Sequence, residues 1–372
     1  MKFTCEKSQF LYAINTTIRA AAAKSAVPAL EGLLIEAGAV VNVTGYDLKK
    51  GIRSTINADV IEDGNIVINA RLLAEIVRKL DDDVVTVRAT DANLVTVSCG
   101  MSVFEIMGIS AMDYPDLPSV ENTNYITVKN SVLKSMIGET LFAVSDNEAR
   151  PIHTGSLFDI GDANLTVVSV DGYRLALRRE MIEEAHTMTN SFVVPGYALT
   201  EVERILDDDD GALTKIHIGS KQIMFAMDNT TVVSRRLEGE FLNYKNSIPK
   251  TNKFSVKVDR KALINTVERV SLIISDKLKS PVRCRFGDDT LNVYTSSALG
   301  KASDTCPTEG SADNMEIGFN NKYLLDALRA APADTLKLNL SGGTSPCIIV
   351  PDDDSDKFLY MVLPVRLRAN EN

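Results

Sequence analysis

A threefold internal repeat is the feature that most constrains the fold of this 372-residue chain. Three segments share one order, in which an extended stretch leads through a turn of small residues into an amphipathic helix; they are residues 65–80, 191–206 and 316–329. If Ile66, Phe192 and Ile317 are equivalent, the repeats are 126 and 125 residues apart, close to one third of the chain. A constant period of this kind indicates one structural unit used three times.

A second set of patterns recurs with the same spacing. Apolar residues on one helix face begin near Ser8, Asn130 and Arg260, each after a short strand. Short alternating strands follow each of these helices, at residues 32–36, 39–44 and 50–56, then 155–160, 165–170 and 174–179, then 282–286, 290–295 and 300–306. Each third therefore predicts a strand, a helix, three strands and a second strand–helix pair, which is an α+β layered unit.

Two polar stretches with prolines predict where the repeats join. Pro118 precedes the first, near residues 120–124, and Pro249 lies in the second, near residues 248–252. The predicted domains are residues 1–122, 123–250 and 251–372, each of ordinary domain size. The repeat could be a duplication without a shared role, but helices at so constant a period favour a closed or arc-like assembly that presents one face.

The charge of the chain is unevenly distributed. With 40 Lys and Arg against 50 Asp and Glu, the net charge of −10 argues against nucleic acid if it is spread evenly. The six predicted helices, however, carry +6 over 96 residues, which leaves −16 on the strands and loops. Basic residues near helix C-termini also stabilise the helix dipole, so this bias has a structural explanation as well. The Asp runs at 81–83, 207–210 and 352–354 fall in connections, where an acidic rim is favoured over a metal site.

Motifs for catalysis are missing from the sequence. There is no phosphate-binding glycine loop and no GxSxG, and His153, His186 and His217 lack metal-ligand spacing. Five cysteines without CxxC spacing indicate reduced thiols of a cytoplasmic protein. The N-terminus has no signal-peptide pattern, and no apolar run reaches the roughly 18 residues of a membrane span. These absences do not exclude an enzyme, but nothing in the sequence points to one, and we expect no cofactor, no metal and no membrane partner.

Several segments, in order along the chain, resemble the bacterial β sliding clamp, the processivity ring of the replicative DNA polymerase. They are residues 1–4, 27–30, 170–175 (Val-Asp-Gly-Tyr-Arg-Leu), 243–250, 315–323 and 361–367. The resemblance covers essentially the whole chain. It implies three similar clamp domains per chain and a head-to-tail dimeric ring, with helices lining the bore and sheets outside. Twelve helices spaced by ~9 Å would enclose a bore of about 25 Å once helix radii of ~5 Å are subtracted, enough for a DNA duplex.

The resemblance implies that the ring holds double-stranded DNA by encircling it, with phosphate contacts that do not read bases. Lys24, Arg71 and Arg150 are the DNA-contact candidates that it supplies. Arg19, Arg78 and Lys79 are added from their positions on predicted helices. An acidic exterior would keep DNA from binding outside the ring.

The resemblance also implies a surface groove between the second and third domains. In the family this groove accepts short linear motifs from polymerases, the clamp loader and repair proteins. The matching positions are His153, Val170, Gly172, Tyr173, Arg174, Leu175, Leu242, Asn246, Ser247, Leu278, Asn320, Tyr323, Thr344, Pro346, Val362, Leu363, Pro364, Val365 and Arg366. Among them Leu175, Leu242, Val362 and Leu363 are expected to form an apolar slot with a polar rim, as peptide anchors require.

The chain departs from the family at three groove positions, because His153 and Ser247 replace apolar residues and Asn246 replaces an arginine. Residues 368–372 extend past the usual family end and are expected to hang free. Without the resemblance, Asp171-Gly172 is an ordinary turn and residues 363–365 are an edge strand.

The predicted dimer interface joins the first domain of one chain to the third domain of the other. Its candidates are Leu272 and Ile273, with Leu278, against apolar residues around 71–73 and 104–107; a core position is the alternative for Leu272 and Ile273. Two rival functions stay open. One is an enzyme that cleaves DNA with a metal held by residues such as Asp207, and the other is a repeat scaffold that binds peptides without encircling DNA.

Overall fold

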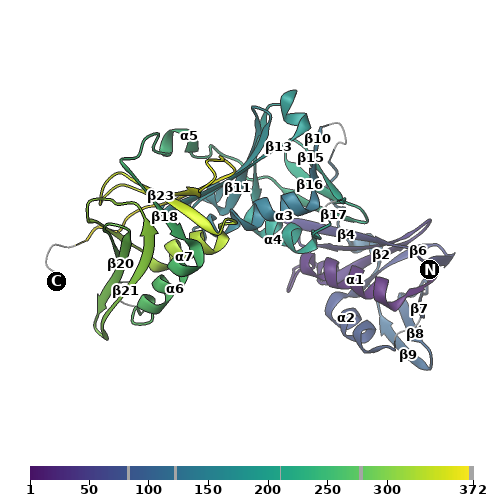
Figure 1. The fold of residues 1–372 in the computed structure, drawn as a ribbon. Helices are drawn as coiled ribbons and strands as arrows, with labels where there is room; N and C mark the ends of the chain where they lie inside the picture. Colours follow the sequence, from purple (N-terminus) through teal and green to yellow (C-terminus); the bar gives the residue numbers. More distant parts are fainter. Residues whose placement is uncertain (82–83, 121–123, 210, 276–279, 368–372) are drawn as a thin grey trace. The chain divides into compact units, whose positions relative to one another are not determined.

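The computed structural model describes the chain except for residues 82–83, 121–123, 210, 276–279 and 368–372 (Figure 1). The chain divides into two compact units. The first contains residues 1–134 and 197–236, and the second contains residues 135–196 and 237–372. The middle repeat is therefore shared between the units, and each unit is described by itself.

Six helices of nine to twelve residues occur at the predicted positions in the described chain. They are α1 (Lys7–Thr17), α2 (Ala70–Lys79), α3 (Asn130–Gly138), α4 (Gly196–Ile205), α6 (Arg260–Ser271) and α7 (Asn321–Ala330). A single turn, α5 (Tyr244–Ser247), lies between the last strand of the second repeat and the first strand of the third, in residues 236–253, which we call the linker. Polar residues that end the preceding strands cap α2 and α6. The Asn69 side chain accepts a bond from the Leu72 backbone N–H at 3.0 Å, and the Asp259 side chain accepts one from the Ala262 N–H at 2.7 Å. These caps explain why α2 and α6 begin directly after a strand.

The first unit contains two antiparallel sheets. One has the strand order β5-β1-β7-β8-β9 and the other has the order β10-β15-β16-β17-β4-β3-β2-β6. The strands are β1 (Lys2–Glu6), β2 (Gly32–Ala37), β3 (Val41–Tyr46), β4 (Lys50–Ile56), β5 (Asp59–Glu62), β6 (Gly64–Asn69), β7 (Val84–Ala89), β8 (Leu94–Cys99), β9 (Ser102–Met107), β10 (Tyr125–Lys129), β15 (Leu213–Ile218), β16 (Gln222–Met227) and β17 (Thr230–Arg235).

The second unit contains one twelve-stranded antiparallel sheet, with the order β14-β11-β12-β13-β25-β24-β23-β18-β21-β20-β19-β22. Its strands are β11 (Gly155–Gly161), β12 (Asn164–Val170), β13 (Arg174–Met181), β14 (Asn190–Pro195), β18 (Phe254–Asp259), β19 (Val282–Phe286), β20 (Thr290–Ser297), β21 (Gly300–Glu309), β22 (Met315–Phe319), β23 (Thr335–Leu340), β24 (Cys347–Pro351) and β25 (Phe358–Val362).

The predicted repeat was incomplete, because three further strands follow the second helix of each repeat. They are β7 to β9, β15 to β17 and β23 to β25. The signal was present in the sequence. In β7, Val85, Val87 and Ala89 are buried, and the residues between them are not. Each repeat therefore contains two copies of a strand–helix–three-strand unit. The sequence patterns predicted the first copy in full but only the strand and helix of the second.

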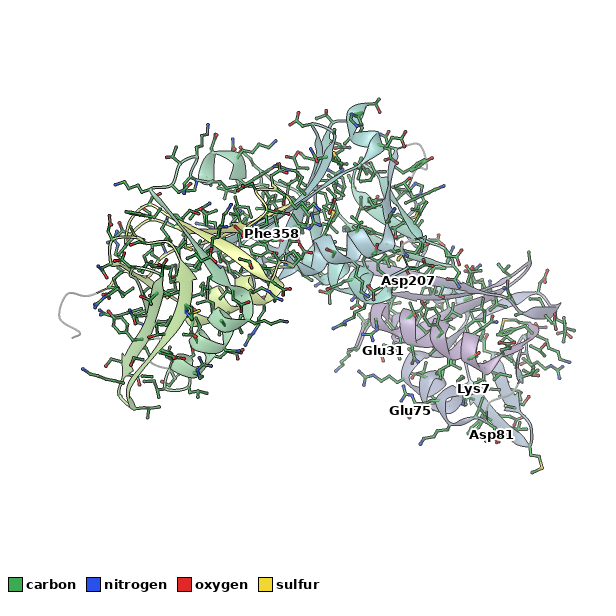
Figure 2. All side chains as sticks on the ribbon, in the orientation of Figure 1. Lys7, Glu31, Glu75, Asp81, Asp207 and Phe358 are labelled. Carbon is green, nitrogen blue, oxygen red and sulfur yellow. The ribbon has the colours of Figure 1, made fainter. Side chains whose placement is uncertain are left out.

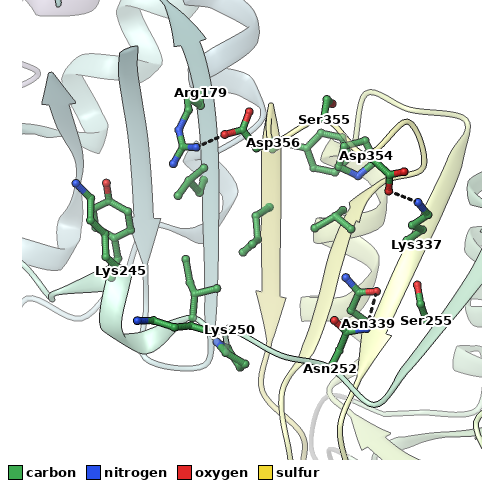
Figure 3. A pocket seen from close by; sticks show the side chains of 18 residues that line it. Arg179, Lys245, Lys250, Asn252, Ser255, Lys337, Asn339, Asp354, Ser355 and Asp356 are labelled. Atoms are coloured by element: carbon green, nitrogen blue, oxygen red, sulfur yellow. Dashed lines mark hydrogen bonds and ion pairs between the residues drawn. The ribbon is translucent and has the colours of Figure 1, made fainter. Parts of the chain in front are cut away.

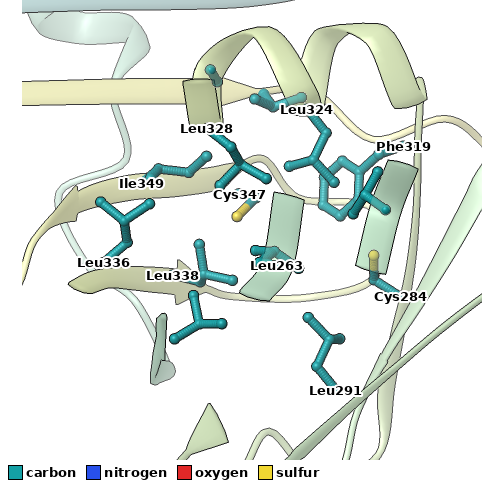
Figure 4. Close-up of a cluster of buried hydrophobic side chains, with 14 of the residues drawn as sticks. Leu263, Cys284, Leu291, Phe319, Leu324, Leu328, Leu336, Leu338, Cys347 and Ile349 are labelled. Atoms are coloured by element: carbon teal, nitrogen blue, oxygen red, sulfur yellow. The ribbon is translucent and has the colours of Figure 1, made fainter. Parts of the chain in front are cut away.

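The first and third repeats have their own apolar cores. Phe3, Phe10 and Leu73 are fully buried where α1 and α2 lie side by side. In the third repeat α6 and α7 contribute Leu263 and Leu324 to a core that also holds strand residues such as Phe319 (Figure 4). Truncating such a side chain to Ala typically costs about 2–5 kcal/mol. At the start of α1, Lys7 donates to the Leu80 carbonyl at 2.7 Å, next to Asp81 in the sequence (Figure 2).

Two strand pairings join consecutive repeats, and we call each of them a seam. In the first seam, residues 50–54 of β4 pair with residues 234–230 of β17. In the second seam, residues 174–178 of β13 pair with residues 362–358 of β25. Both seams follow one rule, because the third strand after the first helix of a repeat pairs with the last strand of the following repeat. Each compact unit is built around one seam.

Candidate peptide groove and basic surface residues

A tight turn opens the predicted groove between β12 and β13. The Asp171 carboxylate accepts bonds from the backbone N–H groups of Tyr173 at 2.8 Å and Arg174 at 3.0 Å. Gly172 has a φ of +92°, which favours glycine. The turn leaves the Tyr173 side chain 60% exposed, whereas Val170 just before it is buried. The sequence Asp171-Gly172 is therefore a turn that also presents an aromatic ring.

Arg174 is the buried centre of the groove region, with only 7% of its surface exposed. Its guanidinium pairs with Asp171 at 2.9 Å and with Asp326 of α7 at 2.6 Å. The same group lies 4.6 Å from the centre of the Tyr323 ring and 5.3 Å from that of Phe142. Two carboxylates and two aromatic faces thus hold one cation, which fixes the start of β13 against α7.

Tyr173 and Tyr323 form a stacked pair, with ring centres 5.7 Å apart and planes at 21°. Asn320 caps α7 and so fixes the helix turn that carries Tyr323. The Leu363 N–H donates to the Tyr173 carbonyl at 2.9 Å, which continues the second seam past β25. Tyr173, Arg174, Asn320, Tyr323 and Leu363, all predicted groove residues, are therefore brought together.

An apolar cluster covers one face of the sheet beside this turn. We call it the outer cluster. It contains Leu157, Val168, Val170, Leu175, Leu177, Val193, Tyr244, Ile348 and Met361, with the partly buried Ile152, Leu237, Phe241, Ile248, Val350, Leu359 and Leu363.

The predicted slot needs a correction. Leu175 pairs with Met361, so both point to the outer cluster, whereas Val362 pairs with Arg174 and belongs to the core of the third repeat. Because neighbouring strand residues face opposite sides, Val362 does not line one slot with Leu175. Leu363 remains with the outer cluster, and Leu242 is 39% exposed in the linker.

The linker side of the groove carries the departures from the family. The His153 ring packs edge-on against Phe241, with centres 5.6 Å apart. Burial, and to a lesser extent Arg150, lowers the pKa of His153, so the ring is neutral at pH 7. Asn243 caps α5 by accepting from the Asn246 N–H at 3.3 Å, and the Ser247 hydroxyl donates to the Asn243 carbonyl at 3.1 Å.

The remaining groove positions lie at the edge of the third repeat. Thr344 and Arg366 are exposed, and Pro346 and Pro364 are half-buried. The Val365 N–H donates to the Gly318 carbonyl at 2.8 Å, which holds this segment against β22. Leu278 and the tail 368–372 lie outside the described residues.

All six predicted DNA contacts are exposed. Arg71, Arg78 and Lys79 lie on α2, Arg19 lies in the 3-10 turn after α1, and Lys24 and Arg150 lie in connections. None of the six forms an ion pair with another described residue. They differ in this from the buried Lys50, which pairs with Glu201 at 2.8 Å.

The predicted dimer contacts are also partly exposed. Leu272 is 83% exposed and Ile273 is half-buried, so Leu272 is not a core residue. On the first repeat, Phe104 and Met107 of β9 are exposed. Leu73 does not contribute to this surface because it is fully buried in its own core, whereas its neighbour Leu72 is exposed.

Comparisons with known proteins decide the family. Three domains described for the DNA polymerase III beta subunit match in order: the N-terminal domain over residues 1–118, the central domain over residues 127–243 and the C-terminal domain over residues 245–366. The chain belongs to the DNA polymerase III beta subunit family. Its three repeats are the three clamp domains of that family.

Relatives of this beta subunit family match over nearly their full length. The beta sliding clamp of Halalkalibacterium halodurans is 32% identical, and the alignment covers 98% of this chain and 100% of the relative. The beta sliding clamp of Bacillus subtilis is 29% identical, with the same coverage.

Solved beta subunit structures have the same fold. The B. subtilis sliding clamp superposes with a TM-score of 0.95 at 28% identity, covering 99% of this chain and 100% of that one. A Pseudomonas aeruginosa sliding clamp bound to griselimycin gives 0.94 at 25% identity, also covering 99% and 100%.

Sequence reasoning missed the groups that hold the candidate groove together. Asp171, Asp326 and Phe142 contact Arg174, yet none was a predicted site residue. A weak signal existed in the sequence, since Lys50 and Arg174 both occupy the first position of equivalent strands. The structure shows that each pairs with a distant carboxylate.

Within the described chain, no group of three or more His, Cys, Asp or Glu side chains is placed to hold a metal ion. No helix among the described residues is long and apolar enough to cross a membrane.

Proposed function

We propose that two copies of this chain close head to tail into a ring that encircles double-stranded DNA and carries the replicative polymerase, the clamp loader and repair proteins on its peptide groove. The domains are residues 1–122, 123–250 and 251–372. The ring acts in the cytoplasm as a processivity factor and catalyses no reaction. Helices line the bore and the sheets lie outside.

The seam rule is the observation that carries this proposal. Two of the three possible seams occur within the chain. Two strands have the positions that form seams but take part in neither seam within the chain. They are β21, the third strand after the first helix of the third repeat, and β9, the last strand of the first repeat. β9 ends its sheet, and β21 pairs with β18 only through Thr308 and Glu309 among the described strands. Pairing β21 of each chain with β9 of the other completes the rule twice and closes a ring of six domains.

The existing seams also give the register of this third seam. In the first seam, Lys50, the first residue of β4, pairs with Ser234, the fifth residue of β17. In the second seam, Arg174, the first residue of β13, pairs with Val362, the fifth residue of β25. Applied to β21 and β9, this register sets Gly300 opposite Ile106, Lys301 opposite Glu105 and Ala302 opposite Phe104. It brings an acidic and a basic side chain together across the seam.

Exposure of β9 supports the same register. The residues equivalent to Phe104 in the existing seams are Val232 and Tyr360, and both are fully buried. Phe104 is 37% exposed in the single chain. An aromatic residue at a position that is otherwise buried in each repeat indicates a surface that a second chain covers.

The basic residues support a protein that encircles DNA with weak contacts, and not one that binds DNA tightly through charge. Arg19, Lys24, Arg71, Arg78, Lys79 and Arg150 are exposed and free of ion pairs with other described residues, so they are available to phosphates. The chain as a whole is acidic, with a net charge of −10. Weak, sequence-independent contacts of this kind permit sliding.

The metal-dependent enzyme has less support than the clamp. Asp207 accepts a hydrogen bond from the Asn130 side chain at 3.0 Å, and Asp208 pairs with Lys134 at 2.9 Å. These carboxylates stabilise the connection after α4 against α3, which accounts for them structurally.

Loading on circular DNA separates the clamp from the peptide-binding scaffold. The protein is loaded on nicked circular DNA by the cognate clamp loader with ATP, isolated by gel filtration, and the DNA is then linearised. A ring is retained on the circle and released from the free ends. Equal retention on both forms would refute encirclement. In parallel, Leu363→Ala is expected to weaken binding of a polymerase tail peptide while the dimer mass stays unchanged.

A further inference from the structure

A second concave site lies on the same sheet face as the groove, and we call it the linker pocket (Figure 3). Its volume is about 600 Å³. Its floor is apolar and includes Leu177 of β13, Leu359 of β25 and Val350 of β24. Leu177 pairs with Leu359, and all three belong to the outer cluster that also contains Leu175 and Leu363 of the groove. The apolar surface is therefore continuous from the groove to the linker pocket.

The charges at the rim of the linker pocket are not equivalent. Arg179 is paired with Asp356 and Lys337 with Asp354, so these four side chains neutralise one another (Figure 3). Lys250 is exposed on the opposite, linker side of the pocket and forms no ion pair with another described residue. Lys245 pairs with Asp159 at 3.3 Å, so among the described residues the rim offers one free cation above an apolar floor.

One segment of the linker forms a wall of both sites. Asn246 and Ser247 are predicted groove residues, whereas Lys245, Ile248 and Lys250 line the linker pocket. The groove begins at Tyr173, directly before β13, and the pocket extends along β13 to Arg179. At about 3.3 Å per residue, six strand residues span roughly 20 Å, which an extended peptide of similar length can cover.

We propose that the linker pocket binds the segment that flanks the docking motif of a partner peptide, with an apolar side chain on the Leu177–Leu359 floor and a carboxylate beside Lys250. The proposal rests on the peptide groove proposed above and extends it to a second anchor. The apolar continuity with the outer cluster argues for the same peptide, and the unpaired Lys250 argues for an acidic flank. Two anchors on one chain bind more tightly than either alone because the second binding step is intramolecular.

Fluorescence anisotropy with synthetic peptides tests this proposal on the full-length protein. The short probe is the docking motif of the cognate polymerase alone. The extended probes carry Ser-Gly-Glu-Leu-Glu at the amino or carboxyl end of that motif, and matched probes carry Ser-Gly-Lys-Leu-Lys. We expect one acidic extension to lower the Kd at least three-fold and the basic extension at the same end to give no gain.

Two variants locate the gain in the linker pocket. Lys250→Glu reverses the free rim charge, and Ser255→Trp fills the pocket from an exposed position on β18. Both are expected to abolish the gain from the extension while the short probe binds as to wild type. Lys253→Glu is the matched control, because Lys253 is an exposed linker residue that does not line the pocket.

The outcomes distinguish this inference from the proposed function. If the short probe binds and Leu363→Ala weakens it, but no extension adds affinity, the groove stands and the linker pocket proposal is refuted. A gain that survives both Lys250→Glu and Ser255→Trp also refutes it. If the short probe does not bind at all, the groove assignment fails and this inference falls with it.

Discussion

Arg174 shows how one residue can determine the geometry of the proposed peptide groove. Its cation is shared by Asp171 at the turn and Asp326 on α7, and its planar group lies against Tyr323. The turn, the helix and the aromatic pair therefore depend on one side chain. Because the two carboxylates are partly buried, each would be left uncompensated without it.

We expect Arg174→Ala to lower the free energy of unfolding by about 3–5 kcal/mol, the range found when one partner of a buried pair is removed. The same change should weaken binding of a polymerase peptide, because Tyr173 and Tyr323 lose their shared support. Urea unfolding and peptide anisotropy measure the two effects.

Arg285 offers the matched control for Arg174. It also pairs with a carboxylate, Glu316 at 2.9 Å, and lies 5.5 Å from an aromatic ring centre, but its side chain is 49% exposed. Arg285→Ala should therefore cost less than about 1 kcal/mol. Equal losses for the two variants would show that burial does not decide the role of Arg174.

The five cysteines make a second prediction at the residue scale. All are buried and unpaired. Burial raises the pKa of Cys5 and of Cys347 to about 12. Since the thiolate is the reactive form, native protein at pH 8 should react slowly with Ellman's reagent, and five thiols should titrate after unfolding. Rapid reaction of the native protein at Cys5 or Cys347, identified by mass spectrometry, would contradict the burial.

The thiols of Cys5 and Cys347 link stability to alkaline pH. Burial raises the folded pKa of both above the unfolded value of about 8.5. Their contribution to stability is therefore complete below pH 8.5 and is lost as the pH rises toward 12.

At the scale of single elements, the sequence predicted the first half of each repeat well. The β4 and β19 boundaries match the predicted residues 50–56 and 282–286, and the helices begin within a residue or two of Ser8, Asn130 and Arg260. Local apolar spacing determines these elements, so it could be recognised without tertiary information.

Pairing across the sheet was not predictable from the same patterns. The face on which Val362 lies depends on the register of β25 against β13, which brings together residues far apart in the chain. The contact between Arg174 and Asp326 likewise joins positions 152 residues apart. Composition and periodicity carry no information on such long-range partners.

The register proposed for β21 and β9 gives a charge-exchange prediction. Lys301→Glu would set two carboxylates opposite each other at Glu105 in both seams between chains. Cross-strand charge pairs contribute roughly 0.2–1 kcal/mol each, so reversal at two seams should raise the dimer Kd about ten-fold. Sedimentation equilibrium measures that constant.

The double variant Glu105→Lys with Lys301→Glu should restore dimerisation, because the opposite charges face each other again. Lys322→Glu on α7 carries the same charge change at an exposed position outside β9 and β21 and should have no effect. Failure of the double variant to recover would count against this register, even if the dimer itself forms.

At the scale of the whole molecule, the basic residues predict a distinctive dependence on salt. Neutralising Arg71, Arg78 and Lys79 together removes three candidate phosphate-binding cations. The slope of log K against log salt for binding to linear DNA should fall by about 0.9 for each phosphate that is no longer neutralised. Retention of loaded protein on closed circles should stay within two-fold, because threading does not depend on those cations. Rapid release from circles would instead indicate that charge alone holds the DNA.

The seam rule also has a consequence for how such a ring comes apart. The β4–β17 and β13–β25 pairings are within one polypeptide, so their partners stay at a high effective concentration however dilute the protein is. The proposed β9–β21 pairing between chains has no covalent tether and would obey mass action. Dilution, or a protein that opens the ring, will therefore separate the strands at the two junctions between chains, although all six junctions have the same strand pairing.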